Sequence, residues 1–202
     1  MSIMLAAWKN DPVSFVRECL GAEADEWQVK ALEDIAQYDR ISIRSGHGVG
    51  KTTFLAWVIL WFLVCWFPCK IPCTANSESQ LRDILWAELR KWHRRMMPGF
   101  RDLLDVKTDR IESKSNPAEC FAVARTARKE NPEALQGFHQ ENLLFIGDEA
   151  SGIHDMIFEV ASGAMSTPGA KTVLTGNPTR GQGYFYNTHT KLRDRWRCQI
   201  GR

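Results

Sequence analysis

The chain has 202 residues, of which 44% are hydrophobic and 25% charged, so it can bury one sizeable core and is not expected to be disordered. Its 26 basic and 24 acidic side chains give a formal net charge of +2, which permits nucleic-acid binding without indicating it. Six cysteines without the density of a secreted scaffold favour reduced thiols and a cytosolic protein.

Neither a membrane span nor a metal-binding cysteine cluster is favoured. The N-terminal run MSIMLAAWKNDP is charged too early for a signal peptide. The longest apolar run, residues 54–67, is shorter than the about 20 residues that span a bilayer, so we interpret it as a helix buried inside the protein. Cys65, Cys69 and Cys73 could hold a metal, but no histidine or fourth thiol accompanies them, and buried packing is the preferred interpretation.

Two helices are expected before the first strand. Asp11 and Pro12 form a cap and first turn, and Gly21 is a suitable stop. A second, amphipathic helix fits residues 25–38, where apolar side chains recur near helical spacing. Residues 41–43 then alternate as a short strand that runs into a glycine-rich segment.

The rest of the chain alternates between strands and helices. The expected elements are a helix at 51–67, a strand at 71–74, a helix at 78–97 capped by Ser77, strands at 110–112, 120–124 and 143–147, a helix at 155–161 and a strand at 171–175. This alternation predicts an α/β fold with a mostly parallel central sheet, helices on both faces and ligands at the carboxyl ends of the strands. With no repeat or linker in view, we expect residues 1–202 to form a single domain.

The glycine-rich segment predicts a phosphate-binding loop. Residues 45–53 read SGHGVGKTT, which completes G-x-x-x-x-G-K-[ST] except for a serine at the first glycine. Glycines let backbone amides converge on phosphate oxygens, Lys51 would offset their charge, and the Thr52 hydroxyl would ligate Mg²⁺. A chance GKT in a glycine turn is the alternative, but the strand before and the helix after favour ATP and Mg²⁺ as cofactors. The expected nucleotide contacts are Ser45, Gly46, His47, Gly48, Val49, Gly50, Lys51, Thr52 and Thr53.

Two further strand ends carry polar residues. Asp148 and Glu149 follow the strand at 143–147, where Asp148 is suited to the Mg²⁺ shell and Glu149 to the water that attacks the γ-phosphate. A solvated acidic turn is the alternative. Thr175, Gly176 and Asn177 end the next strand and could sense the γ-phosphate and couple hydrolysis to the rest of the chain, although such a run alone is usually a turn.

Three segments together resemble the ATPase domain of the large terminase subunit of tailed bacteriophages, the motor that packages DNA into procapsids. They are SGHGVGKTT at 45–53, LLFIGDEASGI at 143–153 and TGNP at 175–178, and the resemblance covers nearly all of the chain. It implies a P-loop NTPase fold of the additional-strand type, with Glu149 as the catalytic glutamate. It also implies that Gln28, in a helical N-terminal part at 1–40, contacts adenine, and that Arg44 is an arginine of the catalytic site. In isolation Gln28 reads as an exposed helix residue.

Two features depart from that family. The trans-acting arginine of many members stands in an Arg-Gly step, and the comparable step here is Gln136-Gly137. Arg125 and Arg128 are nearby substitutes, with solvated surface arginines as the alternative. The chain also ends at Arg202, before the nuclease domain that large terminases usually carry, so no nuclease activity is expected of it.

The predicted function is Mg²⁺-dependent ATP hydrolysis that moves double-stranded viral DNA into a procapsid. Expected partners are DNA of any sequence, the small terminase subunit, the portal and further copies in a ring, with a monomer acceptable for the isolated domain and no membrane. The expected location is the host cytoplasm, transiently at the portal, and not the finished virion. A helicase-like translocase and an ATP-dependent assembly switch remain the rivals.

Two basic clusters are candidates for contacts with DNA phosphates, since a motor should not depend on base sequence. Solvated faces are the alternative for both. They consist of Arg90, Lys91, His93, Arg94 and Arg95, and of Arg193, Arg195 and Arg197.

Overall fold

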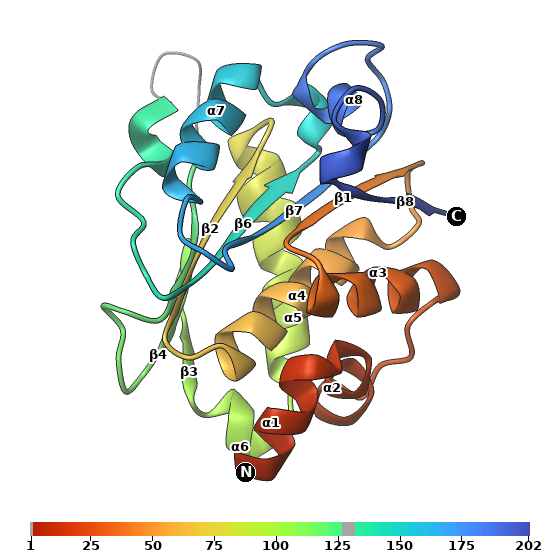
Figure 1. Ribbon diagram of the computed structural model, residues 1–202. Helices are drawn as coiled ribbons and strands as arrows, with labels where there is room; N and C mark the ends of the chain where they lie inside the picture. The colour runs from red at the N-terminus through yellow and green to blue at the C-terminus, as the bar shows by residue number, and fades with distance from the viewer. Residues whose placement is uncertain (1, 127–131) are drawn as a thin grey trace.

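An eight-stranded sheet forms the centre of the computed structural model, which describes residues 2–126 and 132–202 (Figure 1). The strands lie in the order β3-β4-β5-β2-β6-β7-β1-β8. Their bounds are β1 Arg40–Ser45, β2 Cys69–Ala75, β3 Leu104–Val106, β4 Arg110–Ser113, β5 Phe121–Ala124, β6 Asn142–Asp148, β7 Lys171–Gly176 and β8 Arg197–Gly201. All neighbours from β5 to β8 are parallel, and only β3, β4 and β5 pair antiparallel.

The position of β7 determines the class of the fold. It lies between β1, which leads into the glycine-rich loop, and β6, which ends in the acidic pair. A strand inserted between these two defines the additional-strand type. Together with the parallel pairing of most strands, this position confirms the expected α/β fold with a mostly parallel sheet.

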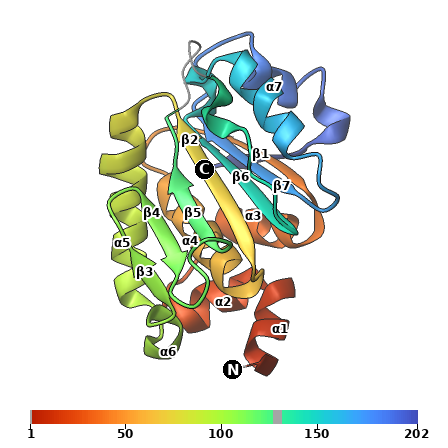
Figure 2. The same cartoon turned by 90° about the vertical axis from the view of Figure 1, so that its left-hand side faces the viewer.

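Helices cover both faces of the sheet (Figures 1 and 2). Their bounds are α1 Ser2–Asn10, α2 Pro12–Cys19, α3 Glu26–Gln37, α4 Lys51–Cys65, α5 Trp86–Arg95, α6 Pro98–Arg101, α7 Asp155–Ala164 and α8 Tyr184–Thr188. Helices α1 to α5 pack on one face and α7 and α8 on the other. Strand β6 serves both cores because successive side chains alternate, with Leu144 and Ile146 in the first core and Phe145 in the second.

Helix α4 accounts for the long apolar run. Every residue from Phe54 to Cys65 is buried, because α1, α2 and α5 cover the sides of α4 that the sheet leaves free. Trp61 also donates its indole hydrogen to the Trp8 carbonyl of α1, with an N–O distance of 2.7 Å. The interpretation as an internal helix is confirmed, and none of the helices among the described residues has the length and apolar character needed to cross a bilayer.

Most predicted elements are present, with some corrections. The Asp11 side chain accepts the Ser14 amide and caps α2 as expected. The helix predicted at 78–97 is interrupted by a π-turn, η1 Gln80–Leu85, and ends at Arg95. Strand β2 begins at Cys69, before the predicted start at residue 71, and its pairing with β6 skips Ile71 and Pro72, of which the proline has no N–H to donate.

The sequence patterns missed α1, α6, α8, β3 and β8. Each of these elements is short, and α1 has Trp8 as its one fully buried side chain. Periodicity over so few residues does not separate an element from a loop.

Candidate active site

The glycine-rich loop joins β1 to α4 and depends on two left-handed glycines. Gly48 and Gly50 have φ angles of +73° and +87°, a region that side chains rarely allow. A Cβ atom on Gly50 would also lie 2.8 Å from Nε2 of Gln28. The loop therefore needs glycine at these positions, and it delivers the chain to the amino end of α4, where free N–H groups favour an anion.

Lys51 lies across the loop and reaches the acidic strand end. Its Nζ donates to the Gly46 carbonyl at 2.8 Å and lies 3.7 Å from Oε1 of Glu149. The lysine is 7% exposed, so its charge is largely removed from water. A buried ammonium needs such partners, and phosphate oxygens could take their place.

Asp148 is completely buried at the end of β6 and is held by three donors. Oδ1 accepts the Thr175 hydroxyl and the Glu149 amide, both at 2.9 Å, and Oδ2 accepts Nε2 of Gln80 at 2.8 Å. Burial raises the pKa of Asp148 above its usual value, and the hydrogen bonds from Gln80 and Thr175 oppose that rise.

Glu149 has a strained backbone. Its φ and ψ are both 47°, and it is the only residue other than glycine with a positive φ in the described part of the chain. Such a conformation costs on the order of 1–3 kcal/mol and is concentrated at functional sites. It turns the side chain toward Lys51 and toward the Asn177 amide, whose nitrogen lies 3.5 Å from Oε2.

The end of β7 connects the loop to the acidic pair. Thr175 donates to Asp148, while Nδ2 of Asn177 lies 2.7 Å from Nε2 of His47 in the loop. Because an amide nitrogen can only donate, the imidazole Nε2 is the acceptor in this contact. Gly176 packs closely, with a built Cβ 3.1 Å from the Ala150 nitrogen. The three motif segments thus meet at the carboxyl edge of the sheet.

Gln28 is buried, contrary to the expectation for an isolated helix residue. Its exposed fraction is 3%, and it serves as the third residue of a capping box, since Oε1 accepts the Asp25 amide at 2.9 Å. Its Nε2 donates to the Gly50 carbonyl at 3.2 Å. Gln28 thereby supports the loop directly, and a contact to adenine stays a prediction.

Two pockets adjoin along the loop and share Gly50 and Thr53. The first has a volume of about 330 Å³ and is lined by His47, Gly48, Gly50, Lys51, Thr52, Thr53, Gln80, Ile84, Glu88 and Glu149. The second, of about 380 Å³, is lined by Gly21, Ala22, Glu23, Asp25, Gln28, Gly50, Thr53, Trp57, Trp92 and Arg95. We call them the phosphate pocket and the base pocket. Together they offer a polar end and a partly aromatic end, as a nucleotide requires.

The sequence predicted the helix that faces the loop but not its contribution to the two pockets. Gln80 and Glu88 line the phosphate pocket, and Glu88 accepts the Thr53 hydroxyl at 2.7 Å. Trp92 and Arg95 line the base pocket, with the guanidinium 4.4 Å from the Trp92 ring centre. Their spacing along the predicted helix was the only available signal, and it does not show which face meets the loop.

Comparison with known proteins identifies this architecture. No protein-family model matches the chain. A probable terminase large subunit of Enterobacteria phage P7 is 26% identical over 194 residues, which make up 94% of this chain and 39% of that relative. The large terminase ATPase domain of Thermus phage P74-26 has a TM-score of 0.68 at 16% identity, over 87% of this chain and 73% of that one. The chain has the fold of a large terminase ATPase domain.

A second terminase structure supports the same assignment. The large terminase of another thermophilic bacteriophage, solved in complex with ADP, has a TM-score of 0.69 at 14% identity, over 88% of this chain and 45% of that chain. The resemblance to large terminase subunits inferred from the three motifs is therefore confirmed by a sequence relative and by the fold.

Arg44 and Arg125 are not among the residues that line the phosphate pocket of this terminase fold. Arg44 is exposed on β1 and lies near His189, on the face that α8 covers. Arg125 is exposed at the end of β5, where its amide donates to the Cys73 carbonyl at 2.8 Å. Arg128 lies outside the described residues, and Gln136 and Gly137 are exposed. A catalytic role for any of these arginines stays a prediction.

The two basic clusters have partners within the terminase fold. Arg90 donates to the Thr108 carbonyl at 2.7 Å, Lys91 lies 2.9 Å from Glu88, and Arg95 donates to the Gly21 carbonyl at 3.1 Å. In the second cluster, Nε of Arg197 donates to Asp34 at 3.0 Å. These contacts favour structural roles for the residues that make them and leave DNA contacts as a prediction.

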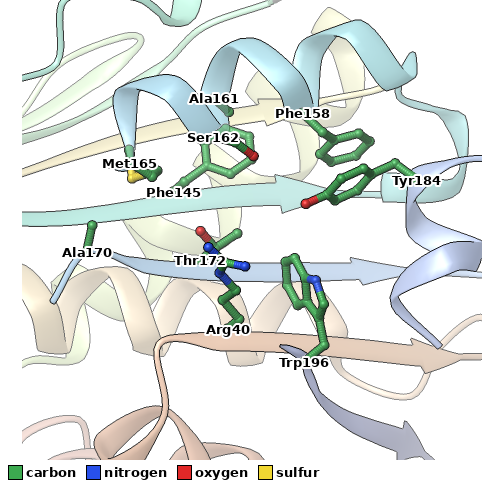
Figure 3. A pocket seen from close by; sticks show the side chains of 10 residues that line it. All are labelled: Arg40, Phe145, Phe158, Ala161, Ser162, Met165, Ala170, Thr172, Tyr184 and Trp196. Carbon is green, nitrogen blue, oxygen red and sulfur yellow. The ribbon is translucent and has the colours of Figure 1, made fainter. Parts of the chain in front are cut away.

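A further pocket lies under α7, on the other face of the sheet (Figure 3). Phe145, Phe158, Tyr184 and Trp196 are among its lining residues, and its volume is about 40 Å³. That volume holds a few water molecules at most. This pocket is therefore too small for a nucleotide and does not compete with the site along the loop.

Proposed function

We propose that the chain is the ATPase part of a phage large terminase subunit and hydrolyses ATP to move double-stranded DNA into a procapsid. The observation that carries the proposal is the meeting of Lys51, Asp148, Glu149 and Asn177 at the carboxyl edge of the sheet, where Lys51 and Glu149 line the phosphate pocket. Similarity to solved large terminases, including one solved in complex with ADP and also with ATP-gamma-S, supports it. We also propose that residues 1–202 form a single domain.

The loop and Lys51 bind the phosphates in this scheme. The amides of residues 46–52 and the amino end of α4 provide donors, and Lys51 exchanges the Gly46 carbonyl for phosphate oxygens. Gln28 and the aromatic wall of the base pocket hold the adenine. The nucleotide contacts predicted from the sequence for Ser45 through Thr53 are part of this proposed phosphate-binding site.

Thr52 and Asp148 fit a Mg²⁺ ion. Mg²⁺ prefers oxygen ligands, keeps several waters and needs only one or two carboxylates beside the substrate phosphates. Thr52 lines the phosphate pocket, and the buried carboxylate of Asp148 behind it has one acceptor position to spare. The bound ion would offset the negative charge on the phosphate oxygens.

Glu149 orients the attacking water and accepts its proton. In the present structure it lies against Lys51, so phosphate binding to Lys51 would leave the carboxylate free for the water. Asn177 lies between Glu149 and His47, and Thr175 touches Asp148, so the end of β7 contacts both halves of the site. This arrangement suits the coupling role proposed for Thr175, Gly176 and Asn177.

The substitution Glu149→Gln tests the assignment. It keeps the size of the side chain and removes its basicity, so ATP turnover should fall by about 10²–10⁴-fold while binding of Mg-ATP remains. Turnover is measured by phosphate release and binding by calorimetry. Glu159→Gln, on the exposed side of α7, is the matched control and should behave as wild type. Undiminished turnover in the Glu149 variant would refute the role.

The partners are tested separately. A DNA-packaging motor should hydrolyse ATP faster with duplex DNA and procapsids and should not unwind the duplex. Strand separation would favour the helicase-like translocase, and binding without turnover the assembly switch. The small subunit, the portal, a homo-oligomeric ring and a host-cytoplasmic location remain proposals that follow from the terminase assignment.

A further inference from the structure

Gln80, which belongs to none of the three motifs, stands between the phosphate pocket and the buried aspartate. Its Nε2 donates to Oδ2 of Asp148 at 2.8 Å. Gln80 lines the pocket, while Asp148 is 0% exposed and is not among the lining residues. Two residues of the pocket wall thus contact this carboxylate directly, Gln80 through its side-chain amide and Glu149 through its backbone amide.

The hydrogen bonds of Asp148 leave one acceptor position open. A carboxylate has about four lone-pair positions. Thr175 and Glu149 occupy both positions on Oδ1, and Gln80 occupies one on Oδ2. The remaining position is on the oxygen that Gln80 holds. The glutamine amide thus holds the oxygen that carries the free lone pair, while Thr175 and the Glu149 amide hold the other oxygen.

The π-turn η1 brings Gln80 to this place. The Trp86 amide bonds to the Leu81 carbonyl, five residues earlier, so the turn takes more residues than the 3.6 of an α-helix. In a regular α-helix, eight residues advance about 80° beyond two full turns, so Gln80 and Glu88 would point in different directions. The wider turn removes part of that rotation, and both side chains line the same pocket.

Glu88 fixes the other end of this segment. Its Oε1 accepts the Thr53 hydroxyl at 2.7 Å and the Trp92 indole hydrogen at 2.7 Å. Thr53 follows the proposed metal ligand Thr52 on α4. The segment from Gln80 to Glu88 is therefore hydrogen-bonded to the loop helix at one end and to the acidic strand at the other.

We propose that Gln80 is a positioning residue for Mg²⁺-dependent nucleotide binding, which it serves by fixing the Asp148 carboxylate. The inference rests on the proposed function, because it assumes that Asp148 faces a metal ion bound with the nucleotide. Gln80 acts through Asp148. Its loss should thus weaken the contribution of the metal to binding and leave the affinity for the nucleotide itself intact.

The test is calorimetric titration with ADP, first in EDTA and then at increasing Mg²⁺, for the wild type and Gln80→Leu. Leucine has a similar volume and no amide. The Mg²⁺ concentration at half-maximal effect should rise by about tenfold, as expected for losing a hydrogen bond to a charged group, while ADP affinity in EDTA stays within about twofold. Gln37→Leu, at the exposed end of α3, is the matched control and should match the wild type.

The outcomes separate this inference from the proposed function. An unchanged Mg²⁺ requirement in Gln80→Leu overturns the positioning role, and so does an equal loss of ADP affinity with and without Mg²⁺, which would mean that Gln80 only shapes the pocket. Failure of the wild type to bind ADP under any condition contradicts the proposed function instead. Gln80→Asn, which keeps an amide too short to reach Asp148, should shift the Mg²⁺ requirement in the same direction and replaces the leucine variant if that protein does not fold.

Discussion

His189 should make the stability of this protein sensitive to mild acid. It follows α8, and its Nε2 lies 3.0 Å from the hydroxyl of Ser42 on β1. Burial, together with the positive charges of Arg44 and Arg193, lowers the pKa of His189 from 6.5 to about 4. A protonated ring would face the positive charges of these two guanidinium groups from a partly buried position.

The size of the effect follows from the two pKa values. The unfolded state binds a proton near pH 6.5 and the folded state only near pH 4, so stability is complete above pH 6.5 and is lost as the pH falls through this window. Since one pKa unit corresponds to 1.36 kcal/mol, the free energy of unfolding should drop by about 2 kcal/mol between pH 7 and pH 5 on account of His189 alone.

Urea unfolding at pH 7 and pH 5 measures this loss against His189→Gln, which cannot titrate and still presents a polar atom to Ser42. Other groups titrate equally in both proteins and cancel in the difference. The wild type should lose about 2 kcal/mol more than the variant. Equal losses, or a His189 resonance that titrates near pH 6.5 by NMR, would refute the reasoning.

Two further substitutions test the packing around the site. Ile59→Ala removes a fully buried side chain of α4, so the free energy of unfolding should fall by about 2–5 kcal/mol in urea, and a loss below about 1 kcal/mol would show that the core around α4 can collapse. Asp34→Ala removes the acceptor of Arg197 and of the buried Gln199 amide, which should cost about 1–3 kcal/mol and speed hydrogen exchange in β8. Unchanged exchange in β8 would show that this strand does not depend on Asp34.

The sequence predicted the parts of the site that lie at strand ends. In a parallel sheet these ends share one edge, so Lys51, Asp148 and Thr175 could be expected at that edge before the order of the strands was known. The burial of Gln28 could not be predicted in this way. It depends on the contact with the Gly50 carbonyl, which is 22 residues away in the sequence.

The contribution of the helix after β2 was also invisible. Apolar spacing predicted one regular helix, and periodicity carries no sign of the π-turn that directs Gln80 to Asp148. The contacts of Arg90 and Arg95 could not be predicted from the sequence either. Their charge was evident, but the carbonyls that they bind belong to segments far away in the sequence.

Because α4 is enclosed along its length, it can shift only if the core opens around it. The phosphate loop leads directly into the amino end of this helix, so the carboxyl end of the loop is held in a fixed position. Residues 80–88 form the facing wall of the phosphate pocket, where Gln80 donates to Asp148 of β6 and Glu88 accepts from Thr53 of α4. Leu81, Leu85 and Trp86 of this wall are buried in the same core as α4, so neither wall can move toward a nucleotide without disturbing that core.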